Sequence, residues 1–176
     1  MYGIVSLLDD AHDARIKGIL NEIQDVSTTS IPHLSYHVAP TYELNTLKPV
    51  LSQLAGKTQS FRMKTSGLGV FTGPEPVLYI TVVATCFLLD FQKSIWGAVD
   101  GNTSDSVEHY CPDNWMPHIT LAQRSIDHDS LRDRIRFLSE RDFSWNIEIN
   151  NLAVIFDEDS QQGWRLASTL VDNGRN

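Results

Sequence analysis

Two short segments of the chain carry the same set of residues able to transfer protons and to bind phosphate. They read Pro-His-Leu-Ser-Tyr from residue 32 and Pro-His-Ile-Thr-Leu from residue 117. The first offers His33 and Ser35, and the second offers His118 and Thr120. Because side chains two residues apart on a β-strand project from the same face, each histidine should lie beside its hydroxyl, with the apolar neighbours on the opposite face.

Two such strands on either side of one cleft would suit the cleavage of a phosphodiester. A neutral imidazole accepts a proton from water, and a protonated one gives a proton to the departing ribose oxygen. Hydroxyl groups donate hydrogen bonds to the non-bridging oxygens, whose negative charge grows in the transition state. We assign His118 as the base and His33 as the acid, and the reverse assignment is also open. One histidine–hydroxyl pair is incidental in most sequences, so the prediction depends on the matched second copy.

The order of expected elements repeats between the two halves of the chain. In the first half, apolar spacing and the Pro and Gly positions predict strand 2–8, helix 10–26, strand 33–39, helix 44–54 and strands 60–64 and 69–71. In the second half they predict strand 77–84, helix 87–99, polar loop 100–114, strand 118–123, helix 131–138 and strands 143–156 and 164–170. Each half places its Pro-His-x-hydroxyl segment on the second strand, which indicates an internal duplication.

Composition limits the classes of protein that fit. The chain has 176 residues, of which 41% are hydrophobic, so a folded protein with a sizeable core is expected rather than a disordered one. The net charge of −8 argues against sequence-independent binding to duplex DNA. Two cysteines, without a Cys-x-x-Cys motif or a recognisable signal peptide, favour a cytoplasmic protein. The longest apolar run, Val77 to Leu89, is too short to span a membrane.

The paired segments resemble the His-x-Ser/Thr motifs of the two-histidine (2H) phosphoesterase superfamily, and of its 2′-5′ RNA ligase-like branch in particular. The second motif, Trp115 to Leu121, fits closely. In the first, Ser35 stands where many members have Thr, and Tyr36 stands where an aliphatic residue is common. The resemblance implies that the catalytic residues are His33 and His118, with Ser35 and Thr120 binding phosphate.

The fold implied by the resemblance is a bilobal α+β architecture with an approximate two-fold axis. Each lobe is expected to be an antiparallel sheet with helices packed outside it, and the active-site cleft should lie between the lobes. The whole chain, 1–176, would be one such domain, with lobes of about residues 1–73 and 77–171. The implied activity is that of a phosphodiesterase acting on 2′,3′-cyclic phosphates or 2′-5′ linkages. Ligation, the reverse reaction, and a non-catalytic RNA- or nucleotide-binding module on the same fold are the alternatives.

Three further residues are candidates for substrate contacts. His37 shares the predicted face of His33 if the strand alternates regularly, although a structural or solvated role is the stronger alternative. Arg124 follows the second motif and could neutralise a phosphate, or form a surface ion pair. Trp115 could stack on a base or pack in the core. Phe71 could line the rim of the cleft, but the core is its favoured place.

No metal or other cofactor is expected for this chemistry. His33 and His37 form the one His-x₃-His pair, and on a strand they would lie about 13 Å apart, too far to share a metal ion. The expected partner is therefore the phosphodiester substrate alone, in a nucleotide or at an RNA end, with no membrane and no duplex DNA involved. The sequence predicts no particular oligomeric state.

Overall fold

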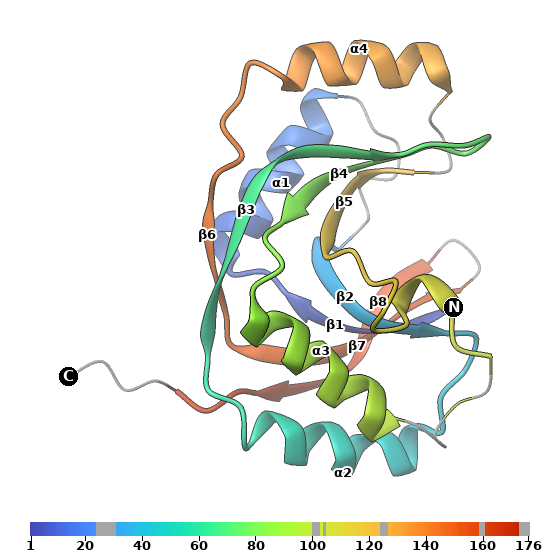
Figure 1. Ribbon diagram of the computed structural model, residues 1–176, viewed down its shortest axis with the longest axis vertical. Helices are drawn as coiled ribbons and strands as arrows, with labels where there is room; N and C mark the ends of the chain where they lie inside the picture. Colours follow the sequence, from blue (N-terminus) through green and yellow to red (C-terminus); the bar gives the residue numbers. More distant parts are fainter. Residues whose placement is uncertain (24–30, 100–102, 104, 124–126, 159–160, 173–176) are drawn as a thin grey trace.

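The computed structural model describes residues 1–23, 31–99, 103, 105–123, 127–158 and 161–172 (Figure 1). The strands are β1 (Tyr2–Leu7), β2 (His33–Ala39), β3 (Phe61–Phe71), β4 (Val77–Val82), β5 (His118–Ala122), β6 (Asn146–Ile149), β7 (Asn151–Glu158) and β8 (Gln161–Thr169). The helices are α1 (Asp10–Glu22), α2 (Leu44–Ala55), α3 (Cys86–Val99) and α4 (His128–Leu138), with a short 3₁₀ helix, η1, at Glu108–Tyr110. Within this described part of the chain, every helix is too short or too polar to cross a bilayer.

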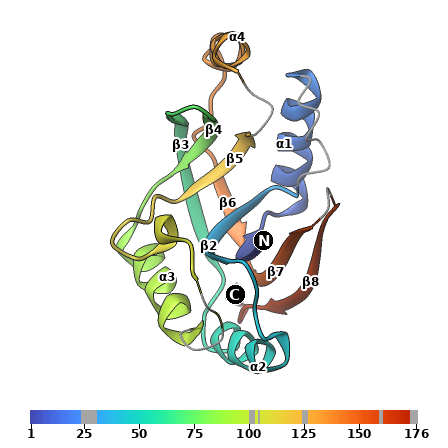
Figure 2. The same ribbon diagram turned by 90° about the vertical axis from the view of Figure 1, so that its right-hand side faces the viewer.

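The strands form two four-stranded antiparallel sheets, and this confirms the predicted α+β class. The strand orders are β2-β1-β7-β8 and β5-β4-β3-β6. The helices lie outside the sheets, with α2 at one end of the molecule and α4 at the opposite end (Figures 1 and 2). In each sheet the strand that carries a histidine motif, β2 or β5, is an edge strand.

The two sheets exchange strands between the halves of the sequence. β3 comes from the first half but pairs with β4 and β6, while β7 and β8 come from the second half but extend the sheet of β1. The expected lobe boundary near residues 73–77 therefore does not separate the sheets. It falls in the tight turn of the β3–β4 hairpin, in which Phe71 pairs with Val77. The chain passes from the second sheet back to the first between β6 and β7, which Asn150 alone separates.

Helices also cover the sheet of the opposite half. α1 contacts β5, α3 contacts β2, and α2 packs on β7, β8 and α3. The apolar spacing predicted from the sequence supplies the buried faces: Ile16, Ile19 and Leu20 on α1, and Leu88, Phe91, Ile95 and Val99 on α3. One continuous core, to which α1, α2 and α3 all contribute buried residues, joins both halves.

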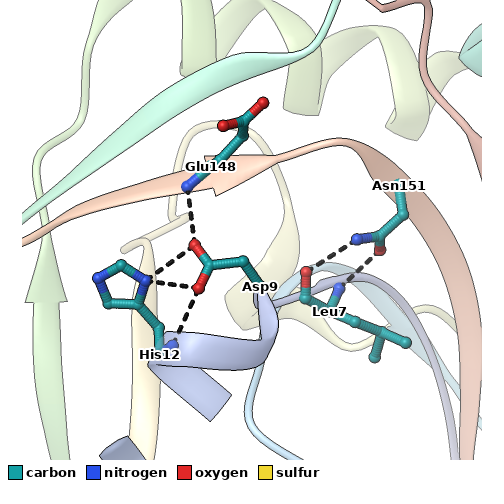
Figure 3. Close-up of polar contacts among 5 residues, drawn as sticks. All are labelled: Leu7, Asp9, His12, Glu148 and Asn151. Atoms are coloured by element: carbon teal, nitrogen blue, oxygen red, sulfur yellow. Dashed lines mark hydrogen bonds and ion pairs between the residues drawn. The ribbon is translucent and has the colours of Figure 1, made fainter. Parts of the chain in front are cut away.

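Two polar side chains fasten the junction between β1 and α1 to the crossover from β6 to β7 (Figure 3). Asp9 caps α1 by accepting the backbone N–H of His12 at 2.9 Å, and it also accepts the N–H of Glu148 at 3.2 Å. The Asn151 amide completes the end of β1, since it accepts the N–H of Leu7 and donates to its carbonyl, at 2.8 and 2.9 Å. These contacts hold the segment in which the chain leaves β6 of one sheet and enters β7 of the other.

Candidate active site

The structure brings the four principal candidates of the sequence into one pocket. β2 and β5, the two motif-bearing edge strands, contact each other across the sheets. His33, Ser35, His118 and Thr120 line a pocket of about 80 Å³ at this contact. Among the described residues, Ile31, Tyr110 and Gln123 also line it. Each sheet therefore contributes one imidazole and one aliphatic hydroxyl to the pocket.

Both histidines are anchored to the backbone in the same way. His33 Nδ1 lies 2.6 Å from the carbonyl oxygen of Ile31, and His118 Nδ1 lies 2.6 Å from that of Met116. A carbonyl oxygen only accepts, so in each ring Nδ1 carries the hydrogen. Nε2 is then the nitrogen that exchanges a proton with a bound molecule: it accepts one when the ring is neutral and donates one when the ring is charged.

The surroundings of the two rings favour neutral histidines. Burial lowers the pKa of His33 below its ordinary value, and the nearby His118 lowers it further, against an opposing contribution from the Ile31 carbonyl. Burial also lowers the pKa of His118, while the Met116 carbonyl opposes the change. Two positive rings are thus disfavoured together. An anionic phosphate between them would favour protonation, because an opposite charge stabilises the charged form of an imidazole.

Aromatic side chains hold the His118 ring. The ring of Phe71 meets it edge to face, with centroids 4.9 Å apart, and the ring of Tyr79 lies at 5.1 Å. Tyr79 in turn lies so close to Gly69 on the neighbouring strand that a Cβ there would clash with its ring. Because Gly69 has no side chain, the Tyr79 ring can pack against β3 while it contacts the His118 ring.

A larger pocket of about 600 Å³ adjoins the small one and shares Tyr110, His118, Thr120 and Gln123 with it. Its other walls include Val70, Phe71, Val77, His109, Asn114 and Met116. The described residues that line the two pockets include no Lys, Arg, Asp or Glu. An apolar wall with a few polar groups suits a flat ring with hydrogen-bonding edges.

Several of these lining residues were not predicted from the sequence. Tyr110 and His109 lie in the polar loop expected over residues 100–114, in which no site residue was assigned, and Gln123 also had no role assigned. Phe71, whose favoured place was the core, is only half-buried and lines the larger pocket. The sequence feature that could have pointed to this part of the pocket is the adjacent pair His109 and Tyr110, shortly before the second motif.

A β-bulge in β2 changes the predicted position of His37. Ile4 pairs with His37, but the next residue, Val5, pairs with Ser35, so Tyr36 is an extra residue on this strand. The alternation of faces breaks at such a bulge, and two consecutive side chains, Tyr36 and His37, are both buried. The prediction that His37 shares the cleft face of the motif is therefore wrong.

His37 lies instead in a buried polar contact away from both pockets. Its Nδ1 is hydrogen bonded to the hydroxyl of Tyr42. Its Nε2 lies 3.1 Å from the hydroxyl oxygen of Ser106, with which it is also hydrogen bonded. The Trp96 ring of α3 lies with its centroid 4.5 Å from the imidazole. His37 thus joins β2 to two neighbouring segments and to α3.

Trp115 and Arg124 complete the set of sequence candidates. Trp115 is buried among core residues, with its ring near Tyr36, and it lines neither pocket. Its Nε1–H donates to the carbonyl of Ser35 at 3.0 Å, so it supports β2 from the core side. The core alternative is therefore the one observed for Trp115. Arg124 lies outside the described residues.

No cluster of three or more His, Cys, Asp or Glu side chains that could hold a metal ion occurs among the residues described by the structure. The arrangement that is present offers two proton-transfer groups and two hydroxyl donors around a space large enough for a phosphate.

Comparisons with known proteins agree with this architecture. A sequence model of the family described as the 2′-5′ RNA ligase superfamily matches residues 9–161. Among solved structures, TT0787 of Thermus thermophilus is 17% identical with a TM-score of 0.69, over 98% of each chain. Apo LigT of E. coli is 13% identical with a TM-score of 0.64, over 97% of this chain and 96% of its own.

Usb1 of Kluyveromyces marxianus is 14% identical with a TM-score of 0.51, over 96% of this chain and 98% of its own. E. coli LigT has also been crystallised with 3′-AMP, ATP and NADP⁺. A search of curated protein sequences gave no significant match to the chain. At these identities the likeness to solved structures establishes a shared fold.

Proposed function

The chain belongs to the 2′-5′ RNA ligase superfamily, and from this membership and its paired histidines we propose that it is a metal-independent phosphodiesterase. Its substrates are 2′,3′-cyclic phosphates or 2′-5′ phosphodiester linkages of nucleotides or RNA ends. The observation that carries the proposal is the shared pocket of His33 and His118, each with Nδ1 anchored to a backbone carbonyl. That anchoring presents two equivalent proton-exchanging nitrogens to one bound phosphorus centre.

The reaction follows from the positions of these groups. Nε2 of one histidine takes a proton from water as the water oxygen bonds to phosphorus. The bond from phosphorus to the ribose oxygen breaks on the opposite side, and the second histidine gives its Nε2 proton to that oxygen. Ser35 and Thr120 donate hydrogen bonds to the non-bridging oxygens, whose charge increases in the transition state. Each proton transfer contributes about 10²–10⁴-fold to the rate.

The larger pocket decides which histidine we assign to each role. It adjoins His118 and not His33, so a nucleoside bound there places the departing ribose oxygen on the His118 side. The attacking water then enters from the side of His33. We therefore propose His118 as the acid and His33 as the base, the reverse of the assignment preferred from the sequence.

Small nucleotides and exposed RNA ends fit the pocket better than structured nucleic acid. The net charge is −8, and the described pocket lining holds no cationic side chain of Lys or Arg. Nucleotide binding is supported by the relative LigT, which has been crystallised with 3′-AMP and ATP. The free thiols of Cys86 and Cys111 are compatible with the reducing cytoplasm that the sequence predicts.

The direct test is an incubation with 2′,3′-cyclic nucleotides, 2′-5′ dinucleotides and RNA ended by a cyclic phosphate, in the presence of a chelator. Products are identified by mass spectrometry. We expect hydrolysis by the wild type and loss of turnover in His33→Ala/His118→Ala, with His128→Ala, an exposed histidine on α4, as the matched control. Wild-type turnover by the double variant would rule out the two-histidine mechanism. Nucleotide binding without any turnover would favour the binding module, and joined products would favour ligation.

The two roles are separated with bis(p-nitrophenyl) phosphate, whose leaving group departs without a proton. A variant that lacks the acid keeps most of its turnover of this ester, whereas one that lacks the base does not. We expect His118→Ala to remain active on it and His33→Ala to lose about 10²–10⁴-fold. The opposite ranking would reverse the assignment.

A further inference from the structure

β2 carries a second histidine, His37, which the β-bulge turns away from the cleft and into the interior. Bulges next to active sites commonly re-aim a side chain in this way. The re-aimed imidazole meets Ser106, with its Nε2 3.1 Å from the hydroxyl oxygen, although the two residues are 69 positions apart in the chain. A hydrogen bond between segments so distant in sequence places one of them on the other.

The segment that this contact holds is 105–110, which ends in η1 and is termed the wall segment. Its last two residues line the larger pocket, and Tyr110 lines the small pocket as well. Next to Ser106, the N–H of Val107 donates to the carbonyl of Val38 on β2 at 2.9 Å. The wall segment is therefore hydrogen bonded to β2 at two consecutive residues.

α3 fastens the other end of the wall segment to the same place on β2. Gln92 is buried, and its Nε2 donates to the carbonyl of Tyr110 at 2.8 Å and to that of Tyr36 at 3.1 Å. Tyr36 is the extra residue of the bulge, and His37 follows it directly. The bulge thus supplies both attachment points, an imidazole for Ser106 and a carbonyl that shares its donor with Tyr110.

The backbone at the start of the wall segment depends on these contacts. Asp105 has a φ of 61°, in the left-handed region that residues other than glycine seldom adopt. Such a conformation persists where the surrounding contacts hold it, and the hydrogen bonds of Ser106 and Val107 come immediately after it. Loss of the Ser106 hydroxyl should therefore allow the segment to adopt other conformations, in which the wall of the pocket differs.

We propose that Ser106 is a positioning residue for nucleoside binding, because its hydrogen bond with His37 holds the wall segment where it forms one side of the larger pocket. The inference rests on the proposed function, in which the nucleoside of the substrate occupies that pocket. When only a fraction of the molecules has the wall in place, the apparent affinity falls in proportion to that fraction. The histidines and hydroxyls of the two motifs lie on β2 and β5, so bound substrate should still react at its normal rate.

The kinetic test compares the wild type with Ser106→Ala and Ser106→Thr on the 2′,3′-cyclic nucleotide that the wild type hydrolyses fastest. Removal of one neutral hydrogen bond predicts a KM about fivefold higher in Ser106→Ala, with kcat nearly unchanged. Ser106→Thr retains a hydroxyl and should restore most of the wild-type KM. A wild-type KM in Ser106→Ala, or a fall in kcat alone, would overturn the proposal.

Ser130→Ala is the matched control, because Ser130 also uses its hydroxyl in a hydrogen bond, accepting the N–H of Asp127 at 3.1 Å, but at the start of α4. Ser130 lines neither of the two pockets. The control should lower the thermal stability and leave KM unchanged. A comparable rise in KM in Ser130→Ala would show that general destabilisation sets KM, and would overturn the positioning role.

Two measurements need no turnover. Hydrogen exchange followed by NMR should show a less protected Val107 amide in Ser106→Ala than in the wild type, since this amide donates to Val38. Calorimetric titration with 3′-AMP should give a Kd about fivefold higher in the same variant. Equal protection of Val107 in both proteins would overturn the inference even if the enzyme is active. A wild type that hydrolyses nothing on the substrate panel, but binds 3′-AMP more tightly than Ser106→Ala does, would count against the proposed function alone.

Discussion

Protonation of His37 should set much of the acid sensitivity of this fold. Burial lowers the pKa of His37 from 6.5 to about 4, because its ring is enclosed by Trp96, Tyr42 and Ser106 and has no carboxylate among these partners. The unfolded chain binds a proton near pH 6.5, whereas the folded one resists it. Stability is therefore fully present above about pH 6.5 and is lost as the pH falls toward about 4.

The size of this loss follows from the pKa difference. One pH unit corresponds to about 1.4 kcal/mol, so the free energy of unfolding should fall by about 3 kcal/mol over this window through His37 alone. The assay is urea unfolding of the wild type and of His37→Gln between pH 7.5 and pH 4. The variant should be less stable at pH 7.5, but its stability should fall by about 3 kcal/mol less on acidification.

His128→Gln, which changes an exposed histidine, should follow the wild-type curve. Titration of the His37 ring in the wild type by NMR checks the same point without a variant. An equal acid loss in the wild type and His37→Gln, or a His37 resonance that titrates near pH 6.5, would refute the reasoning.

Three further predictions concern the site and its supports. His118→Ala should raise the pKa of His33, because the substitution opens the site to water and removes the neighbouring imidazole. NMR titration of His33 measures this shift, and an unchanged titration would contradict the proximity of the two rings. Gln92→Leu should lower the free energy of unfolding by about 2 kcal/mol, because the buried Tyr36 carbonyl and the partly buried Tyr110 carbonyl both lose their donor. Unaltered urea unfolding would show that water replaces the amide. Asp9→Ala should cost about 1–2 kcal/mol through the lost helix cap, measured by thermal melting, whereas Asp9→Asn, which can still cap, should cost less.

Local patterns were sufficient for the elements and for the central residues of the site. The apolar spacing of Ile16, Ile19 and Leu20 predicted the buried face of α1, and these side chains are buried. Within each motif the alternation of polar and apolar residues placed the histidine and its hydroxyl on one face. Such features depend on neighbours within one strand or one helical turn, so they can be inferred from adjacent sequence.

The bounds of some strands were less accurate for a physical reason. β3 runs unbroken from Phe61 to Phe71, where two strands were expected, because Gly67 adopts a φ of 89° and shifts the register without ending the strand. Conversely, the single strand expected over 143–156 is divided at Asn150. There the chain leaves one sheet for the other, and no local pattern marks which sheet a strand joins.

Only the tertiary structure decided how the halves combine and what surrounds the histidines. The duplicated order suggested lobes that follow the sequence, yet β3 and β7 each complete the sheet of the other half. The bulge at Tyr36 moved His37 into the core, and Gln92 of α3 holds the backbone of Tyr110 at the small pocket. Pairing between distant strands and contacts across the core depend on residues far apart in the chain, whose meeting no short stretch of sequence encodes by itself.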